Sequence, residues 1–156
     1  MGREIERKFL VRAPGWRDVV AYTQTLRQGY LAKRGDLSVR IRIIDGAAGW
    51  LTIKHGGTAL DRAEFEYPVP AAEAQELLGV CEGRLIEKHR HHLILPGGDW
   101  VVDEFAGQLA GLVLVEVEIA DARQPLDLPD WLGPEVTGDP RYYNATLAGM
   151  TADGEI

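Results

Sequence analysis

The stretch Glu4-Ile5-Glu6-Arg7-Lys8-Phe9-Leu10 near the N-terminus decides the character of the fold. Successive side chains of a β-strand point to opposite faces of its sheet. Two acids and one base, Glu4, Glu6 and Lys8, therefore share one face of this strand, while apolar residues such as Phe9 lie on the other. The charged face combines groups that bind metal ions with a group that binds anions.

The same alternation recurs along the chain, and each further strand that it predicts has an apolar face and a face that carries charge. These strands are expected at residues 23–32, 37–44, 50–54, 62–69, 85–95, 100–105 and 112–119. The alternation is cleanest over residues 112–119 and weakest over residues 85–95. Most of the charged residues come in i, i+2 pairs, with two single members: Arg40 and Arg42, Glu64 and Glu66, Lys88 and Arg90, Glu116 and Glu118, then Lys54 and Asp103.

Helices are expected at residues 15–21, 70–78 and 142–150. The second is rich in Ala, Glu, Gln and Leu, which favour helices, and Gly79 offers a stop. We find no repeat or linker that would divide the chain. Residues 1–156 are therefore expected to form one domain, a size that allows one sizeable core.

Composition limits the classes of function. The formal net charge is −7, a poor basis for binding nucleic acid, and no apolar run approaches the length of a membrane-spanning helix. The N-terminus has no apolar secretory signal, and Cys81 is the only cysteine, so no internal disulfide can form. We therefore expect a cytoplasmic protein with a small-molecule ligand, no nucleic-acid or membrane partner, and a monomeric or homodimeric state.

Two explanations fit the charged faces. Antiparallel sheets often have a solvated polar face, and charges there carry no special meaning. However, like charges placed side by side repel one another unless counter-ions are present. If the sheet closes into a barrel with its apolar faces outward, the charges line the interior, where ions must compensate them. Paired carboxylates suit Mg²⁺ or Mn²⁺, and paired Arg and Lys suit phosphate oxygens. The second explanation thus predicts a site for a metal-bound polyphosphate.

The sequence also resembles a known family. Glu4-Ile5-Glu6-Arg7-Lys8 matches the ExExK signature of the CYTH domain, or triphosphate tunnel metalloenzyme, superfamily. The resemblance extends over essentially the whole chain, which is most similar to the short bacterial branch of the family. The matching segments occur in the family's order: residues 26–31, 39–42, 52–54, 64–66, 87–90, 102–105, 114–118, 131–137 and 141–144.

The resemblance implies an α+β fold that is mainly β, with a closed eight-stranded antiparallel barrel, a charged interior and helices packed outside. It implies two divalent ions, Mg²⁺ or Mn²⁺, bound together with the substrate. The residues that it assigns to phosphate oxygens are Lys8, Arg40, Arg42, Lys54 and Arg90. Those assigned to metal, directly or through water, are Glu4, Glu6, Glu64, Glu66, Asp103, Glu116 and Glu118. Tyr30 and Lys88 match positions implicated in acid–base catalysis.

The expected function is metal-dependent hydrolysis of inorganic tripolyphosphate, in which positioning and charge neutralisation do most of the work. Three alternative substrates stay within the same fold: thiamine triphosphate, a nucleoside triphosphate, or ATP cyclised to cAMP. A non-catalytic polyphosphate-binding module is a further alternative, although binding an anion alone would not need the acidic pairs.

Overall fold

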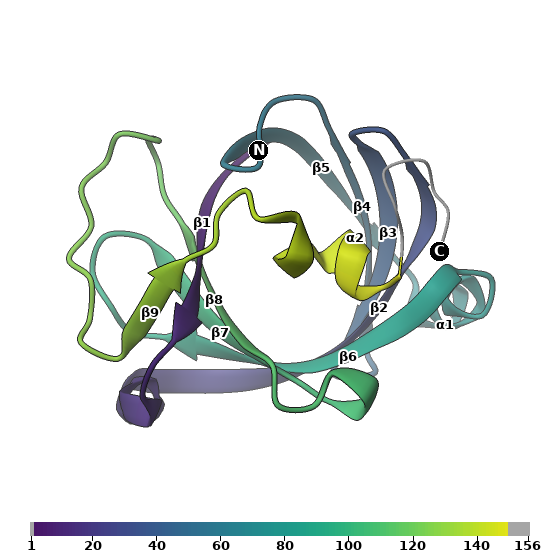
Figure 1. Ribbon diagram of the computed structural model, residues 1–156. Helices are drawn as coiled ribbons and strands as arrows, with labels where there is room; N and C mark the ends of the chain where they lie inside the picture. The colour runs from purple at the N-terminus through teal and green to yellow at the C-terminus, as the bar shows by residue number, and fades with distance from the viewer. Residues whose placement is uncertain (1, 150–156) are drawn as a thin grey trace.

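Nine antiparallel strands form one continuous sheet in the computed structural model, which describes residues 2–149. Figure 1 looks down into the ring that they make. The strands are β1 (Arg3–Val11), β2 (Val20–Arg34), β3 (Leu37–Ile44), β4 (Ala48–His55), β5 (Asp61–Val69), β6 (Glu82–Leu93), β7 (Asp99–Phe105), β8 (Val113–Glu118) and β9 (Leu132–Glu135). The helices are α1 (Ala71–Leu78), α2 (Asn144–Leu147) and three 3-10 turns, η1 (Pro14–Val19), η2 (Gly107–Leu109) and η3 (Pro140–Tyr142).

The sheet closes through its first strand. The strand order is β5-β4-β3-β2-β6-β7-β8-β1-β9, and β1 also pairs with β5, from Arg3 opposite Ala63 to Ile5 opposite Asp61. Further along, β1 pairs with β8 on one edge and with the short β9 on the other. Eight strands thus form a closed barrel, and β9 is an added edge strand. This confirms the predicted eight-stranded antiparallel barrel.

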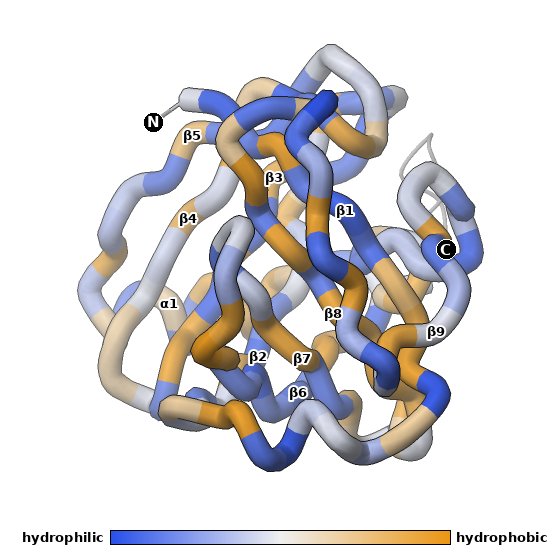
Figure 2. Tube along the Cα trace, turned by 90° about the vertical axis from the view of Figure 1, so that its left-hand side faces the viewer, coloured by the Kyte–Doolittle hydropathy of each residue, from blue (hydrophilic) through white to orange (hydrophobic). Residues whose placement is uncertain are grey.

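The register turns the charged faces inward. Lys8 lies opposite Glu116 and Arg90 lies opposite Asp103, so charged residues on neighbouring strands share the interior face. Apolar side chains at the intervening positions point outward. Figure 2 shows hydrophobic and hydrophilic positions alternating along the strands. The interior is therefore a largely charged lumen, and most of the apolar core lies between the barrel wall and the segments that cover it.

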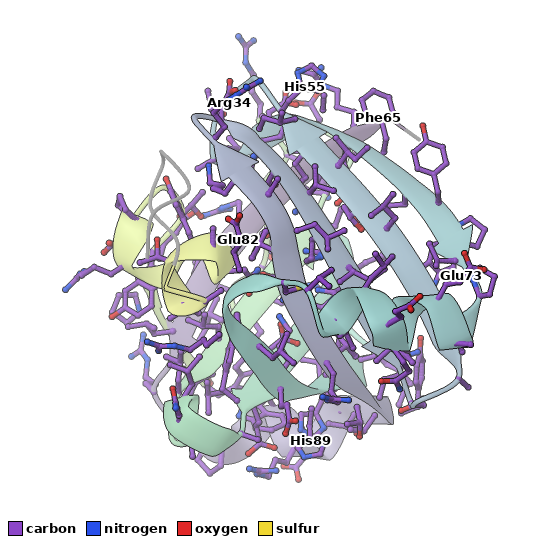
Figure 3. The ribbon with its side chains drawn as sticks, turned by 90° about the vertical axis from the view of Figure 1, so that its right-hand side faces the viewer. Arg34, His55, Phe65, Glu73, Glu82 and His89 are labelled. Atoms are coloured by element: carbon purple, nitrogen blue, oxygen red, sulfur yellow. The ribbon has the colours of Figure 1, made fainter. Side chains whose placement is uncertain are left out.

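Two apolar layers cover the outside of the wall. The larger one joins Val115 and Val117 of β8 to Trp16 of η1 and to Trp131 and Leu132 near the start of β9. On the opposite side, α1 packs against β3. Figure 3 shows α1 crossing one end of the β3–β4 face, while His55 and Phe65 lie at the other end. Each fully buried aliphatic or aromatic side chain in such layers contributes roughly 1.5–3 kcal/mol.

The helical segments differ from expectation in two places. Residues 15–21 were expected to form a helix, but the structure has only the 3-10 turn η1, which stops where β2 begins at Val20. For residues 142–150 it has only the four-residue α2, and Met150 lies outside the described residues. Within the part that is described, no helix is long and apolar enough to cross a membrane.

The segment of η3 and α2 lies across one opening of the barrel (Figure 1). Ala148 is fully buried and packs with Tyr30, Ile86 and Phe105 on the lumen side of the strands. Lys8 Nζ donates to the carbonyl oxygen of Tyr142 at 2.9 Å. This C-terminal segment therefore forms part of the wall of the site.

Candidate active site

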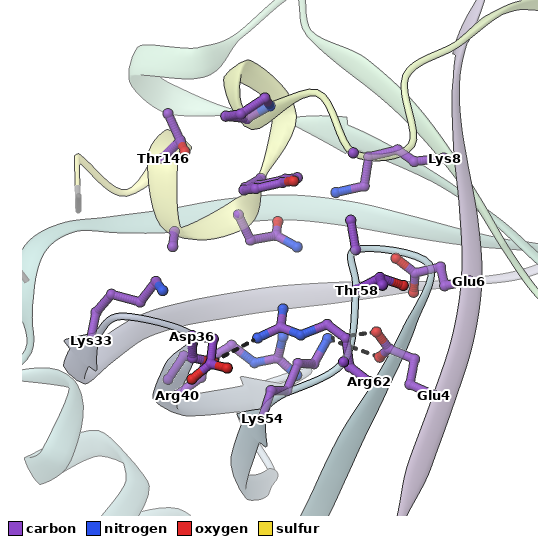
Figure 4. A pocket seen from close by; sticks show the side chains of 18 of the residues that line it. Glu4, Glu6, Lys8, Lys33, Asp36, Arg40, Lys54, Thr58, Arg62 and Thr146 are labelled. Carbon is purple, nitrogen blue, oxygen red and sulfur yellow. Dashed lines mark hydrogen bonds and ion pairs between the residues drawn. The ribbon is translucent and has the colours of Figure 1, made fainter. Parts of the chain in front are cut away.

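The lumen contains two cavities of opposite charge, with volumes of about 640 Å³ and about 720 Å³, and Glu6 lines both. Bases dominate the first cavity, which lies at the opening covered by η3 and α2. Figure 4 shows this cavity. Its charged residues are the bases Lys8, Lys33, Arg40, Lys54 and Arg62 and the acids Glu4, Glu6 and Asp36. Acids dominate the second cavity, where Glu6, Asp99, Glu116 and Glu118 accompany Arg90 and His92.

An ion-paired triad lies on β1, β4 and β5. Lys54 Nζ lies 2.8 Å from Glu4 Oε2 and 3.5 Å from Glu64 Oε2. Burial alone would raise the pKa of Glu4, but Lys54 outweighs it and holds this pKa at about 2. Burial and the hydrogen bond with Glu4 raise the pKa of Glu64 to about 7. The triad therefore has a firmly ionised carboxylate beside one that titrates near neutrality.

A second ion-paired group lies on β6, β7 and β8, with Asp103 at its centre. Asp103 Oδ2 lies 2.8 Å from Lys88 Nζ, and Arg90 binds both Asp103 oxygens at 2.9 and 2.8 Å. Arg90 Nη2 also lies 3.2 Å from Glu116 Oε1. Burial would raise the pKa of Asp103, but Arg90 and Lys88 hold it well below its usual range. We call Lys88, Arg90, Asp103 and Glu116 the Asp103 network.

Two arginines on β3 have neutral partners only. Arg40 Nη2 donates to Thr52 Oγ1 at 3.2 Å, and Arg42 Nε donates to Gln28 Oε1 at 2.7 Å. Among residues 2–149 neither arginine forms an ion pair. Burial, followed by the charges of Arg40 and Arg90, lowers the pKa of Arg42 well below its usual value. The more distant charges of Asp103 and Glu116 favour the charged form of Arg42, but neither guanidinium group has a carboxylate in direct contact, which favours binding of an anion.

Among the predicted metal ligands, Glu6 has a pKa that is raised further than that of Glu64. Burial, then the charges of Glu116 and Glu4, raises its pKa to about 8. The pKa of Glu118 is raised as well, by burial and then by Glu4. Crowded carboxylates of this kind suit a divalent cation, which would relieve their repulsion.

As the side chains stand, no three His, Cys, Asp or Glu residues within the described ranges converge on one point. Glu4, Asp103 and Glu116 are instead held by lysine or arginine. Glu66 is exposed and accepts only from Thr52 Oγ1, at 3.3 Å. Carboxylate oxygens are the donors that Mg²⁺ and Mn²⁺ prefer, so the residue types fit a metal ion, and their individual roles as ligands stay predictions.

The two predicted acid–base residues lie near the same opening but are not hydrogen-bonded to each other in the described structure. Tyr30 lines the first cavity. Lys88 is fully buried, and its Nζ donates to Asn144 Oδ1 at 3.3 Å as well as contacting Asp103. Burial lowers the pKa of Lys88 to about 7, although Asp103 opposes the shift. Asn144 itself lines the first cavity, so it lies between Lys88 and the cavity.

Several further residues lie in the lumen whose role was not expected from the sequence. Gln28 is fully buried beside Arg42, and Thr52 is nearly so beside Arg40. Neutral side chains carry no charge signal, although the alternation on β2 and β4 places both on the charged faces. Lys33 and Arg62 also line the first cavity, where they donate to the backbone carbonyl oxygens of Gly35 and Asp36. In a sequence, such residues resemble ordinary surface residues.

Comparisons with known proteins agree with this geometry. The family described as CYTH domain matches residues 2–143. An inorganic triphosphatase from Acetivibrio thermocellus is 44% identical over 148 residues, which cover 94% of each chain. One from Nitrosomonas europaea is 42% identical over 149 residues, covering 93% of this chain and 96% of the relative. A solved structure of an inorganic triphosphatase is 39% identical with a TM-score of 0.67, covering 93% of this chain and 97% of that one.

Proposed function

The chain belongs to the CYTH domain family, and we propose that it hydrolyses inorganic tripolyphosphate with a divalent metal ion. Two relatives that cover almost its whole length are inorganic triphosphatases. The enzyme is accordingly a hydrolase of phosphoanhydride bonds, and its substrate is a small triphosphate. The observation that carries the proposal is the pair of buried guanidinium groups of Arg40, which lines the cation-rich cavity, and Arg42, two residues along the same face of β3; neither has a carboxylate in direct contact among the described residues.

The bases of the lumen divide into two groups for phosphate binding. Arg40 and Arg42 have no carboxylate to displace before they bind phosphate oxygens. Lys8 and Lys54 line the same cavity but are already paired with Glu116 and Glu4, and Arg90 is held by Asp103. We assign the first contacts with the substrate to the two unpaired arginines, and the three paired bases complete the binding.

The acidic residues are assigned to the metal. Glu4, Glu6, Glu116 and Glu118 lie on neighbouring strands β1 and β8, and their oxygen donors suit Mg²⁺ or Mn²⁺. When bound, two such ions would neutralise phosphate charge and lower the pKa of a coordinated water. Glu6 would be the central ligand, because it lines both cavities and lies close to the carboxylates of Glu116 and Glu4.

Lys88 and Tyr30 are proposed to act as the acid–base groups of the hydrolysis. A group with a pKa near 7 can act as acid or base at neutral pH, which fits Lys88. Tyr30 lines the first cavity together with Asn144, the residue to which Lys88 donates. Lys88 therefore has a hydrogen-bonded route to the cavity through Asn144, and Tyr30 offers a hydroxyl in the same space.

The direct test is release of phosphate from tripolyphosphate with Mg²⁺ or Mn²⁺. The wild type is compared with Glu4→Ala, Lys88→Ala and the control Glu73→Ala, which changes an exposed residue of α1. We expect both lumen variants to lose at least about 100-fold in kcat/KM, the usual range for a catalytic acid or base. A wild type that releases no phosphate contradicts the function, and normal turnover by Glu4→Ala contradicts the metal assignment.

The same assay separates the alternative substrates. Thiamine triphosphate and ATP are offered beside tripolyphosphate, and cAMP is measured directly. We expect the highest kcat/KM for tripolyphosphate, because every charged contact described above suits phosphate oxygens. A preference for either organic triphosphate would move the proposal to that substrate, and cAMP formation would identify a cyclase.

A further inference from the structure

Gln28 of β2 is an uncharged side chain in the middle of a charged lumen. It has no exposed surface, and it lies opposite Arg42 of β3 on one side and Ile86 of β6 on the other. Its Oε1 accepts a hydrogen bond from Arg42 Nε at 2.7 Å. Gln28 is therefore the partner that fixes the direction of the Arg42 guanidinium group.

A neutral partner has a different consequence from a charged one. A bidentate carboxylate, such as Asp103 on Arg90, orients a guanidinium group and also neutralises it. An amide oxygen accepts the same kind of hydrogen bond and leaves the full positive charge in place. With Nε bound to Gln28, both Nη atoms of Arg42 keep the fork that matches two phosphate oxygens.

The nitrogen of the Gln28 amide indicates that a glutamine at this position is unfavourable for the stability of the fold. Gln28 Nε2 is buried and has no hydrogen-bond partner in the described part of the chain. A buried donor without an acceptor destabilises a fold, and an apolar side chain of similar length would avoid that cost. Arg42 is also held close to the like charges of Arg40 and Arg90. The pair of Gln28 and Arg42 thus keeps a buried positive charge that a glutamate at position 28 would cancel.

We propose that Gln28 is a positioning residue for substrate binding, which aims Arg42 at the phosphate chain while leaving its charge uncompensated. This inference rests on the proposed function. The ligand is an inorganic phosphate chain, and Gln28 acts on it only through Arg42. No other residue of the described structure accepts a hydrogen bond from the Arg42 side chain.

Two substitutions separate charge from orientation. Gln28→Glu keeps the acceptor and the length but neutralises Arg42, and Gln28→Met keeps the length but removes the acceptor. We expect KM for tripolyphosphate to rise about 10-fold in Gln28→Glu and about 3-fold in Gln28→Met, with kcat within about 3-fold of the wild type. In metal-free protein, the midpoint of thermal unfolding should not fall in either variant.

The chain provides a matched control. Gln75 of α1 also accepts from an arginine, Arg27, at 3.5 Å, but it lies on the outside of the barrel. Gln75→Glu makes the same chemical change beside a guanidinium group and should leave KM unchanged. Isothermal titration of each protein with tripolyphosphate in the absence of metal gives a second measure of binding, independent of turnover.

The outcomes are distinguishable. Unchanged KM and unchanged binding in Gln28→Glu overturn the inference, as does a lowered unfolding midpoint with kcat and KM reduced together. If neither variant folds, Gln28 is a structural residue and the inference is also wrong. A wild type without activity on tripolyphosphate would instead contradict the proposed function, whatever the variants do.

Discussion

Arg42 and Arg90 are both buried arginines of the lumen, but their surroundings are opposite. Arg90 binds both oxygens of Asp103 and also contacts Glu116, so acidic groups compensate its charge. Arg42 binds one amide oxygen; the charges of Arg40 and Arg90 act against its own charge, and those of Asp103 and Glu116 favour it without direct contact. Arg90 on β6 therefore belongs to a network in which opposite charges are in contact. Arg42 on β3 has a neutral partner and no carboxylate in contact among the described residues.

The difference separates stability from function. Removing one member of a buried ion-pair network leaves the remaining charges uncompensated, which is strongly destabilising. Removing an uncompensated charge instead relieves repulsion, so its presence is better explained by a ligand than by the fold. We infer that the Asp103 network holds the strands of the lumen in place, and that Arg40 and Arg42 are kept for the substrate.

The largest effect is expected from Asp103→Asn. This change removes the negative charge between Lys88 and Arg90, both of which stay buried. We expect a loss of about 3–5 kcal/mol in the free energy of unfolding, measured by urea denaturation. Asp139→Asn, which alters an exposed pair with Arg141, is the control and should cause no measurable loss. If the two variants were equally stable, the network would have no structural role.

A smaller effect is expected when each arginine is replaced by methionine. Arg90→Met leaves Asp103 and Glu116 short of a partner and should cost about 2 kcal/mol. Arg42→Met should change the free energy of unfolding by less than about 1 kcal/mol, because it relieves repulsion while leaving only Gln28 Oε1 unpaired. Both variants should bind tripolyphosphate at least about 10-fold more weakly by calorimetry. Equal destabilisation by the two changes would remove the distinction between the two arginines.

The smallest effect is expected at an exposed pair outside the lumen. Arg7 donates to both oxygens of Glu135 at 2.9 and 2.7 Å, and this hydrogen bonding lowers the pKa of Glu135 from its usual value of 4.5. A lowered carboxyl pKa stabilises the fold above pH 4.5 and loses that effect as the pH falls.

Because the Glu135 pair is exposed and screened, Glu135→Gln should cost at most about 1 kcal/mol at pH 7. At pH 3 the variant should be closer to the wild type, and urea denaturation at the two pH values measures both differences. A cost at pH 7 as large as that of Asp103→Asn would mean that burial does not separate the two kinds of ion pair.

Alternation in the sequence predicted the strands and their charged faces, and the resemblance to the CYTH family predicted that they close into a barrel. The interior positions of Glu4, Lys8, Arg40 and Arg90 follow from period-two patterning once the sheet is closed. The short strand β9 was not predicted, because its four residues include Gly133 and Pro134 and show no alternation of apolar and polar side chains. Residues 142–150 gave only a short helix, and their contribution to the cavity depends on packing against Tyr30 and Phe105.

The sequence by itself determined which residues share a face of each strand, because side-chain direction in a strand is a local property of the backbone. Only the tertiary structure decided which charges meet. Lys8 and Glu116 are more than a hundred residues apart, and their pairing depends on the register in which β1 joins β8. The registers of the sequential pairs β6–β7 and β2–β3 place Arg90 against Asp103 and Arg42 against Gln28. Whether a buried charge is compensated depends on distances of a few ångströms between strands, and these are fixed only by the register in which the strands pair.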